Sequence, residues 1–414
     1  MRHFKALLSA ALIVSAGGFV LLKTDVSQLH AVVGDTVRRA ALISAGITSP
    51  PASDGSAAHS KSGQAMQESE SIPDREDTPP TEGAPSHASE DTPPTEEAPH
   101  RTSEDMLSQS ESAEEAPPEA AESAARVITQ NINSVDDGLD YTAAGTQSGA
   151  IYRESYGRSN SSEYITLAGG AQVRNCTEDS NEKLLEASEE LPTFRIDVNT
   201  AEPQVLIVHT HTTESYEPYV RSYYDSDFPY RSQDSEHNMI AVGEVLAQTL
   251  AEHGISVVHD GTTHDHPAYS GAYDRSEATI RAALEQYPSI KVVIDLHRDA
   301  IINPDGSRVA PTVQIDGRSA AQLMIISGCD DGRFDMPDYM ENYKLACLIQ
   351  KSTEELYPGL ARAVLFDYRN YNQHITTGSL LIEVGGHANS LDEALYTGEL
   401  LGESLAKALY CIKS

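Results

Sequence analysis

Tryptophan is absent from this sequence, and basic residues and cysteines are scarce. The 414 residues include 63 acidic against 29 basic residues, which gives a formal net charge of −34. Because the phosphates of DNA and RNA repel so acidic a chain, we expect no nucleic-acid partner. The four cysteines lie too far apart for a CxxC metal or redox motif, and they are too few for a disulfide-stapled scaffold. Four cysteines still allow a single disulfide bridge, so that possibility stays open.

Aromatic residues are missing altogether from residues 49–125. This stretch holds 18 acidic residues, 3 basic residues and 11 of the 21 prolines, and residues 77–104 are a tandem repeat of 14 residues, DTPPTEGAPSHASE followed by DTPPTEEAPHRTSE. Such a composition cannot bury enough apolar surface to offset the conformational entropy that folding removes. We therefore predict that residues 24–160 comprise a juxtamembrane segment and a disordered, acidic, proline-rich linker.

A long apolar run near the N-terminus predicts a membrane anchor. The run ALLSAALIVSAGGFVLL occupies 6–22, with basic residues on both sides. At about 1.5 Å per residue, a helix of this length spans about 26 Å, which is enough for a thin hydrocarbon core. The basic N-terminal end favours the cytoplasm, so we expect residues 1–23 to be a single-pass signal-anchor with the rest of the chain outside. A cleaved signal peptide is the competing interpretation.

The C-terminal part of the chain is predicted to be an α/β domain. Short apolar runs typical of buried strands alternate with segments of helical periodicity. The predicted strands are 205–208, 255–258, 291–296, 323–327 and 379–384, and the predicted helices are 238–253, 276–287, 339–356 and 390–410. This alternation indicates a mostly parallel twisted sheet flanked by helices. We assign 205–414 to one large domain and 161–204 to a lead-in subregion.

Three predicted strands carry side chains that are suitable for chemistry. The first strand runs into His209 and His211, the third ends in His297, and the last contains Glu383. Ligands bind at the carboxyl ends of strands in open α/β sheets, so we expect these side chains to share one edge. Two imidazoles and a carboxylate would leave the fourth position of a tetrahedral zinc ion open for water, which a further carboxylate can deprotonate. The alternative role for Glu383 is a structural salt bridge to Arg298.

Four segments, in this order, resemble the stage II sporulation protein P family. They are VLIVHTHTTESY (205–216), NMIAVGEVLAQTLAEHGISVVHD (238–260), KVVIDLHRDA (291–300) and NQHITTGSLLIEVGGHANSLDEA (372–394). The resemblance implies a zinc-dependent N-acetylmuramoyl-L-alanine amidase with a phosphorylase/hydrolase-like sheet, and endopeptidase activity as well. It further implies peptidoglycan as substrate, the engulfing septum of a sporulating bacterium as location, and stage II sporulation proteins D and M as partners.

The resemblance also implies which residues bind the metal. Members of the superfamily bind zinc through a His after the first strand, a Glu near the start of the next helix, and a His at the end of the third strand. Those roles fall on His211 with His209 as the alternative, on Glu236 with Asp234 and His237 as rivals, and on His297.

Three more residues have roles by the same resemblance or by position. Glu383 matches the catalytic Glu of the last strand. Asp295 lies on the strand of His297 and is expected to orient a metal-binding side chain without contacting the metal itself. Arg298 is expected to bind a substrate carboxylate through paired hydrogen bonds.

Two other functions stay open at this point. A zinc carboxypeptidase that trims stem peptides would have its first His and Glu ligands in H-x-x-E spacing, which His211 and Glu214 match. A wall-binding scaffold without catalysis is the other alternative, although the histidines and Glu383 would then have no chemical role.

Overall fold

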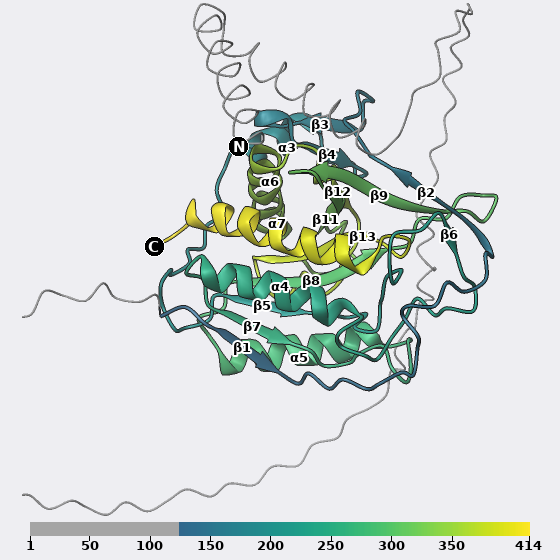
Figure 1. Cartoon of the computed structure of the whole chain (residues 1–414). Coiled ribbons are helices and arrows are strands. Elements are labelled where there is room, and N and C mark those ends of the chain that lie inside the picture. The colour runs from purple at the N-terminus through teal and green to yellow at the C-terminus, as the bar shows by residue number, and fades with distance from the viewer. Residues whose placement is uncertain (1–123) are drawn as a thin grey trace, which may run out of the picture. The chain divides into compact units, whose positions relative to one another are not determined.

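The computed structural model describes residues 124–414 (Figure 1). The anchor predicted at 1–23, the acidic repeat at 77–104 and the remainder of the linker up to residue 123 lie outside the described residues. Among residues 124–414, no helix is both long enough and apolar enough to cross a membrane. The anchor therefore stays a prediction.

Nine strands form the central sheet (Figure 1). From edge to edge the order is β1 (Val127–Gln130), β7 (Val257–Asp260), β5 (Val205–Val208), β8 (Val292–Asp299), β13 (Ser379–Gly386), β11 (Leu323–Gly328), β12 (Val364–Asp367), β4 (Gln172–Asn175) and β3 (Tyr164–Thr166). Within this sheet β11 pairs with β13, and β3 with β4, in antiparallel orientation, while the other neighbours are parallel. The predicted α/β class with a mostly parallel sheet is confirmed.

Helices cover both faces of this sheet (Figure 1). The main apolar core contains residues of α3 (Asn181–Ser188), α4 (Met239–Glu252), α6 (Tyr339–Leu356) and α7 (Leu391–Tyr410). A smaller core forms where α5 (Ala272–Gln286) packs on the opposite face. Along β5, Val205 and Ile207 belong to the main core, while Leu206 and Val208 face α5. This strand is buried on both faces, as its continuous apolar run predicts.

Residues 124–414 also form a second, four-stranded sheet next to the central one. Its strand order is β10 (Arg318–Ala321), β9 (Arg308–Ile315), β2 (Gly149–Glu154) and β6 (Tyr223–Tyr224). The sequence prediction missed all four of these strands. β6 and β10 are short, β2 has few apolar residues, and β9 contains Pro311, which argues against a strand. A short 3₁₀ turn, η1 (Ala168–Gly170), separates β3 from β4.

The folded region begins earlier than the predicted linker boundary at residue 160. β1 extends the central sheet by pairing with β7, and β2 pairs with β9. Residues 127–130 read VITQ, with three β-branched residues in a row, and residues 149–154 read GAIYRE, with Ile151 and Tyr152, so both contain residue types that favour strands. Residues 161–204 are likewise no separate subregion, because β3 and β4 form the other edge of the same sheet.

Helix α5 also begins earlier than predicted. It starts at Ala272, whereas the sequence predicted a start at Ser276 with that serine as the N-cap. Ser276 lies inside the helix, fully buried, and its hydroxyl is 2.7 Å from the hydroxyl of Thr210, just after β5. The serine therefore joins the helix to the strand end that carries the site.

The four cysteines are free. Cys329 and Cys347 are buried, and burial raises the pKa of each thiol to about 12. Both therefore behave as small apolar core residues, and the bridge that the sequence left open does not form.

Candidate metal centre

Three side chains of metal-ligand type meet at the carboxyl ends of β5 and β8. His211, Glu214 and His297 each offer one ligand atom, and these atoms lie within 4.8 Å of one another. Nδ1 of His211 is 3.6 Å from one carboxylate oxygen of Glu214, and Nδ1 of His297 is 3.7 Å from the other. Glu214 and His297 are buried while His211 is partly exposed, so the cluster can be reached from the His211 side.

The sheet topology explains why these side chains meet. β5, β8 and β13 are adjacent and parallel, so their carboxyl ends lie at the same edge. Glu383 on β13 pairs in register with His297 on β8. Paired positions on neighbouring strands project to the same face, which brings Glu383 to the histidine. The prediction that the three strand ends share one edge is confirmed.

Glu214 is held as a charged carboxylate. Burial by itself would raise its pKa, but the nearby Arg298 and the two histidines lower it well below the ordinary value. The backbone N–H of Arg298 also donates a hydrogen bond to Oε2 of Glu214 at 3.1 Å. Because metal ligands must be deprotonated, a buried carboxylate that stays charged suits this role.

Asp295 lies behind His297, as the sequence analysis expected. Its Oδ1 is 2.9 Å from Nε2 of His297, and its carboxylate accepts hydrogen bonds from the N–H and the hydroxyl of Thr210. Burial by itself would lower the pKa of His297, but the Asp295 carboxylate raises it to about 9. Nε2 thus faces Asp295 and Nδ1 faces Glu214, which is the carboxylate–histidine–metal arrangement of zinc sites.

The donor set fits a zinc ion. Two imidazole nitrogens and one carboxylate oxygen are ligands of catalytic zinc, with the fourth position left for water. Tetrahedral zinc with bonds of about 2.0–2.1 Å holds its ligand atoms about 3.4 Å apart. Each histidine Nδ1 lies near that distance from a different oxygen of the Glu214 carboxylate, at 3.6 and 3.7 Å, and the three ligand atoms lie within 4.8 Å of one another.

Glu236, the predicted carboxylate ligand, lies outside this cluster. Its side chain is exposed in the turn before α4. The rivals Asp234 and His237 are paired with each other at 2.9 Å, and the His237 ring stacks on Tyr141. Glu214 has the position that the sequence analysis gave to Glu236, and its H-x-x-E spacing from His211 was the signal for it in the sequence.

His209 also belongs to a different set of contacts. It is fully buried, its Nδ1–H donates to the carbonyl of Leu296 at 3.1 Å, and its Nε2 is 3.0 Å from Nε2 of His259. Burial and the neighbouring His259 lower the pKa of His209 to about 3. Of the two histidines after β5, the structure therefore brings His211 to the cluster and His209 to the interior.

Arg298 makes its hydrogen bonds inside the protein. Its guanidinium is buried and donates to the backbone carbonyls of Ser215 at 2.8 Å and Tyr230 at 2.7 Å. Among the ion pairs of residues 124–414, none joins Arg298 to Glu383, so the alternative salt bridge is absent as well. Arg298 instead holds the loop after β5 and keeps Glu214 charged.

Glu383 has the surroundings of a candidate general base. Its side chain is partly exposed, and its Oε2 is enclosed without a hydrogen-bond partner in the described part of the chain. Burial, followed by the charge of Asp299, raises the pKa of Glu383 to about 8. Gly385 follows two residues later with a φ of +62°. A Cβ at this position would lie 2.6 Å from the Cβ of Ala321, so the backbone here requires glycine.

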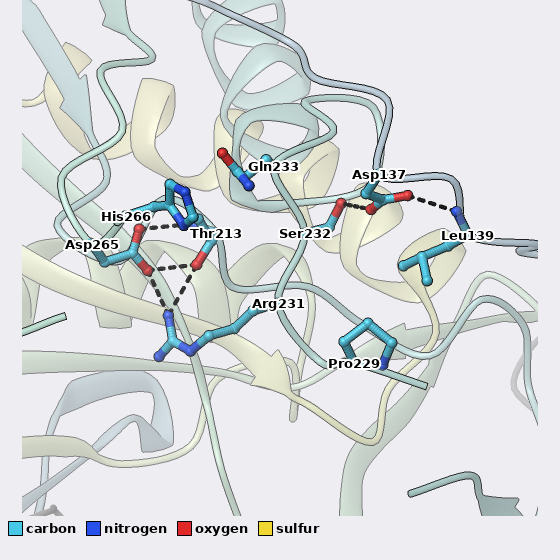
Figure 2. A pocket seen from close by; sticks show the side chains of 9 residues that line it. All are labelled: Asp137, Leu139, Thr213, Pro229, Arg231, Ser232, Gln233, Asp265 and His266. Atoms are coloured by element: carbon cyan, nitrogen blue, oxygen red, sulfur yellow. Dashed lines mark hydrogen bonds and ion pairs between the residues drawn. The ribbon is translucent and has the colours of Figure 1, made fainter. Parts of the chain in front are cut away.

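A cavity of about 230 Å³ lies beside the cluster (Figure 2). It is lined by Asp137, Leu139, Thr213, Pro229, Arg231, Ser232, Gln233, Asp265 and His266. Figure 2 shows Arg231 pointing toward Thr213 and Asp265, and its Nη2 lies 3.6 Å from Glu214. Because Asp137 and Leu139 precede β2, the segment that the sequence assigned to the linker helps to form the surroundings of the site.

Several solved amidase structures share distant similarity with the chain. An N-acetylmuramoyl-L-alanine amidase, AmiC2 of Nostoc punctiforme, is 14% identical, with 51% of this chain and 96% of that chain covered and a TM-score of 0.29. The CwlD amidase from Clostridioides difficile, solved in complex with the GerS lipoprotein, is 14% identical, with 50% and 94% covered and a TM-score of 0.29. These likenesses are too distant to indicate an activity.

Comparison by sequence is more specific. The family model described as Stage II sporulation protein P (SpoIIP) matches residues 63–406. Stage II sporulation protein P of Bacillus subtilis (strain 168) is 32% identical over 200 residues, which are 46% of this chain and 47% of that protein. The chain thus spans about half the length of this curated relative. Because the family model covers well over half of the chain, the chain belongs to the stage II sporulation protein P family.

Proposed function

We propose that this protein is a zinc-dependent peptidoglycan hydrolase that cleaves the amide between N-acetylmuramic acid and L-alanine. One observation carries the proposal: His211, Glu214 and His297 form a zinc-type donor set, and Glu383 stands in register beside His297. Membership of a sporulation family supports a substrate in the cell wall.

The proposal extends to location and partners. The apolar run at 6–22 supports a membrane anchor, which would hold the catalytic domain outside the cytoplasm at the septum of the sporulating cell. The family resemblance supports stage II sporulation proteins D and M as partners, and cleavage of stem-peptide cross-links as a second activity. The acidic linker would let the domain work at a distance from the membrane.

Each residue of the site has a role in this hydrolysis. His211, Glu214 and His297 would hold the zinc ion, and Asp295 would fix the orientation of the His297 ring. When bound, zinc lowers the pKa of water and polarises a carbonyl group. The buried Arg298 keeps Glu214 in its charged form throughout.

Glu383 would move the proton. It takes a proton from the attacking water as the water oxygen bonds to the amide carbon, and the carbonyl electron pair goes to the carbonyl oxygen. It then gives that proton to the amide nitrogen as the C–N bond breaks, which yields a carboxylic acid and a free amine. The unpartnered Oε2 is available for this exchange.

The experiment is a Glu383→Gln substitution in the full-length protein, with purified peptidoglycan as substrate. Glutamine is nearly isosteric and Glu383 is no ligand of the cluster, so zinc content and Tm should stay as in the wild type. Turnover should fall by roughly 10²–10⁴-fold, the usual contribution of a positioned base. Wild-type turnover in this variant would remove Glu383 from the reaction.

A zinc carboxypeptidase is the second candidate, and one observation favours it. The first two members of the cluster are His211 and Glu214, so the ligands have the H-x-x-E spacing of such enzymes. Mass spectrometry of the products separates the two functions. The amidase frees an intact stem peptide with an L-alanine amine, whereas the carboxypeptidase releases single C-terminal residues. If the wild type gives neither product, the scaffold alternative is left.

A further inference from the structure

Tyr273 lies at the entrance of the metal centre. It is in the first turn of α5, and its ring meets the ring of His211 edge-on, with the centroids 5.7 Å apart at 70°. The ring of Tyr371 stacks on the Tyr273 ring, with the centroids 5.4 Å apart and the planes at 25°. The amide of Asn372 donates to the Tyr273 carbonyl at 2.9 Å, so both the ring and the backbone are fixed in place.

The hydroxyl of Tyr273 is a hydrogen-bond donor that the described part of the fold leaves unused. Burial raises its pKa well above the ordinary value, and the charges of Asp295, Glu383 and Glu214 raise it further. Within residues 124–414, no hydrogen bond uses this hydroxyl. The fold gains nothing from it, whereas a hydrogen-bond donor fixed beside a reaction centre can serve the reaction.

Several other side chains near the cluster already donate hydrogen bonds within the protein. Arg298 gives its hydrogen bonds to two backbone carbonyls. Arg231 is bound by Asp265 and Thr213 on the cavity side. Thr210 donates to Asp295. Among these neighbours, Tyr273 is the side chain whose donor takes part in no hydrogen bond within residues 124–414.

We propose that Tyr273 is a catalytic residue whose hydroxyl donates a hydrogen bond to the carbonyl oxygen of the scissile amide as that oxygen gains negative charge. This inference rests on the proposed amide hydrolysis at the same site. When water adds to the carbonyl carbon, its proton goes to Glu383 and the carbonyl electron pair moves to the oxygen, which Tyr273 then stabilises. When the C–N bond breaks, the pair returns, the nitrogen takes the proton from Glu383, and Tyr273 keeps its own proton.

The test is a Tyr273→Phe substitution in the full-length protein, because phenylalanine retains the ring and both stacking contacts. We expect kcat to fall by about 10²–10³-fold, the usual effect of removing one donor to a developing oxyanion. KM should change little, since the bond forms in the transition state. Zinc content and Tm should match the wild type, because no hydrogen bond within the fold is lost.

Tyr287→Phe is the matched control. Tyr287 lies at the other end of α5, where its hydroxyl accepts from Gln286, and its removal should leave kcat unchanged. Wild-type kcat in Tyr273→Phe would overturn the inference. So would a raised KM with normal kcat, or a loss of activity that only follows a loss of zinc or of folded protein.

Failure of this inference is distinct from failure of the proposed function. If the wild type cleaves the amide and Glu383→Gln is slow while Tyr273→Phe is not, only the role of Tyr273 is overturned. If the wild type does not release the L-alanine amine, the proposed function itself is wrong and the role of Tyr273 is overturned with it.

Discussion

His209 and His211 are two residues apart on one segment, yet they lie in opposite surroundings. His209 is fully buried and bonded to Leu296 and His259, whereas His211 is partly exposed and faces Glu214 and His297. In an extended segment, residues two apart would share a face, but the chain turns just after β5. Proximity in sequence therefore says little about which histidine can bind a metal, because the partners come from other strands.

The interior histidines form a contact set of their own. His259 on β7 approaches His209 through Nε2 and faces Glu244 of α4 at 3.2 Å through Nδ1. His264 donates through Nδ1 to the backbone carbonyl of His209 at 2.8 Å. Gly243 leaves room for the pair, because a Cβ there would lie 2.6 Å from Nε2 of His259. These contacts hold the loop after β5 and leave no ring nitrogen of His209 for a metal.

The largest effect is expected from His211→Ala. Removing one of three protein ligands should remove the zinc ion and reduce amide cleavage to background, because two ligands hold zinc weakly. Zinc content after gel filtration, measured by elemental analysis, checks this. A His211→Ala protein that retains one zinc per chain would show that His211 is not the zinc ligand.

His209→Ala should instead cost stability. The change empties a fully buried site and leaves the Leu296 carbonyl and His259 without their partner, so we expect about 2–4 kcal/mol less free energy of unfolding. The folded fraction should still bind zinc. Denaturant unfolding measures the loss, with the exposed His253→Ala as control. Loss of zinc at full stability would mean that His209 is the ligand.

The pH dependence of zinc binding should follow His297. The pKa of this residue in the metal-free protein is raised to about 9, so near neutral pH a proton must leave before zinc can bind. Below that pKa, each unit of acidification should weaken zinc affinity about tenfold, or about 100-fold from pH 8 to pH 6. Competition with a chelator of known affinity measures this. A constant affinity across that range would contradict the assignment of His297.

The smallest effect is expected from Glu236→Gln. The side chain is exposed and outside the cluster, so zinc content, turnover and Tm should equal those of the wild type. Glu214→Gln is the informative partner variant, because it should lose zinc. If Glu236→Gln lost zinc while Glu214→Gln kept it, the ligand assignment would be reversed.

Some features of the site were predictable from sequence because they depend on local pattern. The apolar runs at 205–208, 291–296 and 379–384 predicted three buried strands. The first is β5 with the same bounds, and the other two are β8 and β13 with ends that differ by up to three residues. His297 and Glu383 were found because they end or lie within such runs. Glu214 carried a local signal too, its spacing from His211, but the family pattern favoured Glu236.

The strands at the edges were not predictable in the same way. β1 contains VITQ after a long acidic stretch and is stabilised by pairing with β7, some 130 residues away in sequence. β2 depends on β9 in the same manner. Strands this short have little intrinsic preference, so their formation depends on the partner that the tertiary structure provides.

The sequence by itself determined the α/β class, the positions of the core strands along the chain and the reactive residues at their carboxyl ends, because burial imposes periodicities that can be read along one chain. Only the tertiary structure decided that Glu214 and not Glu236 joins the two histidines, that Arg298 is used internally, and that Tyr273 stands at the entrance. The physical reason is that a ligand set and a hydrogen-bond network are distances between side chains from different elements, and backbone pairing fixes those distances only once the sheet has formed.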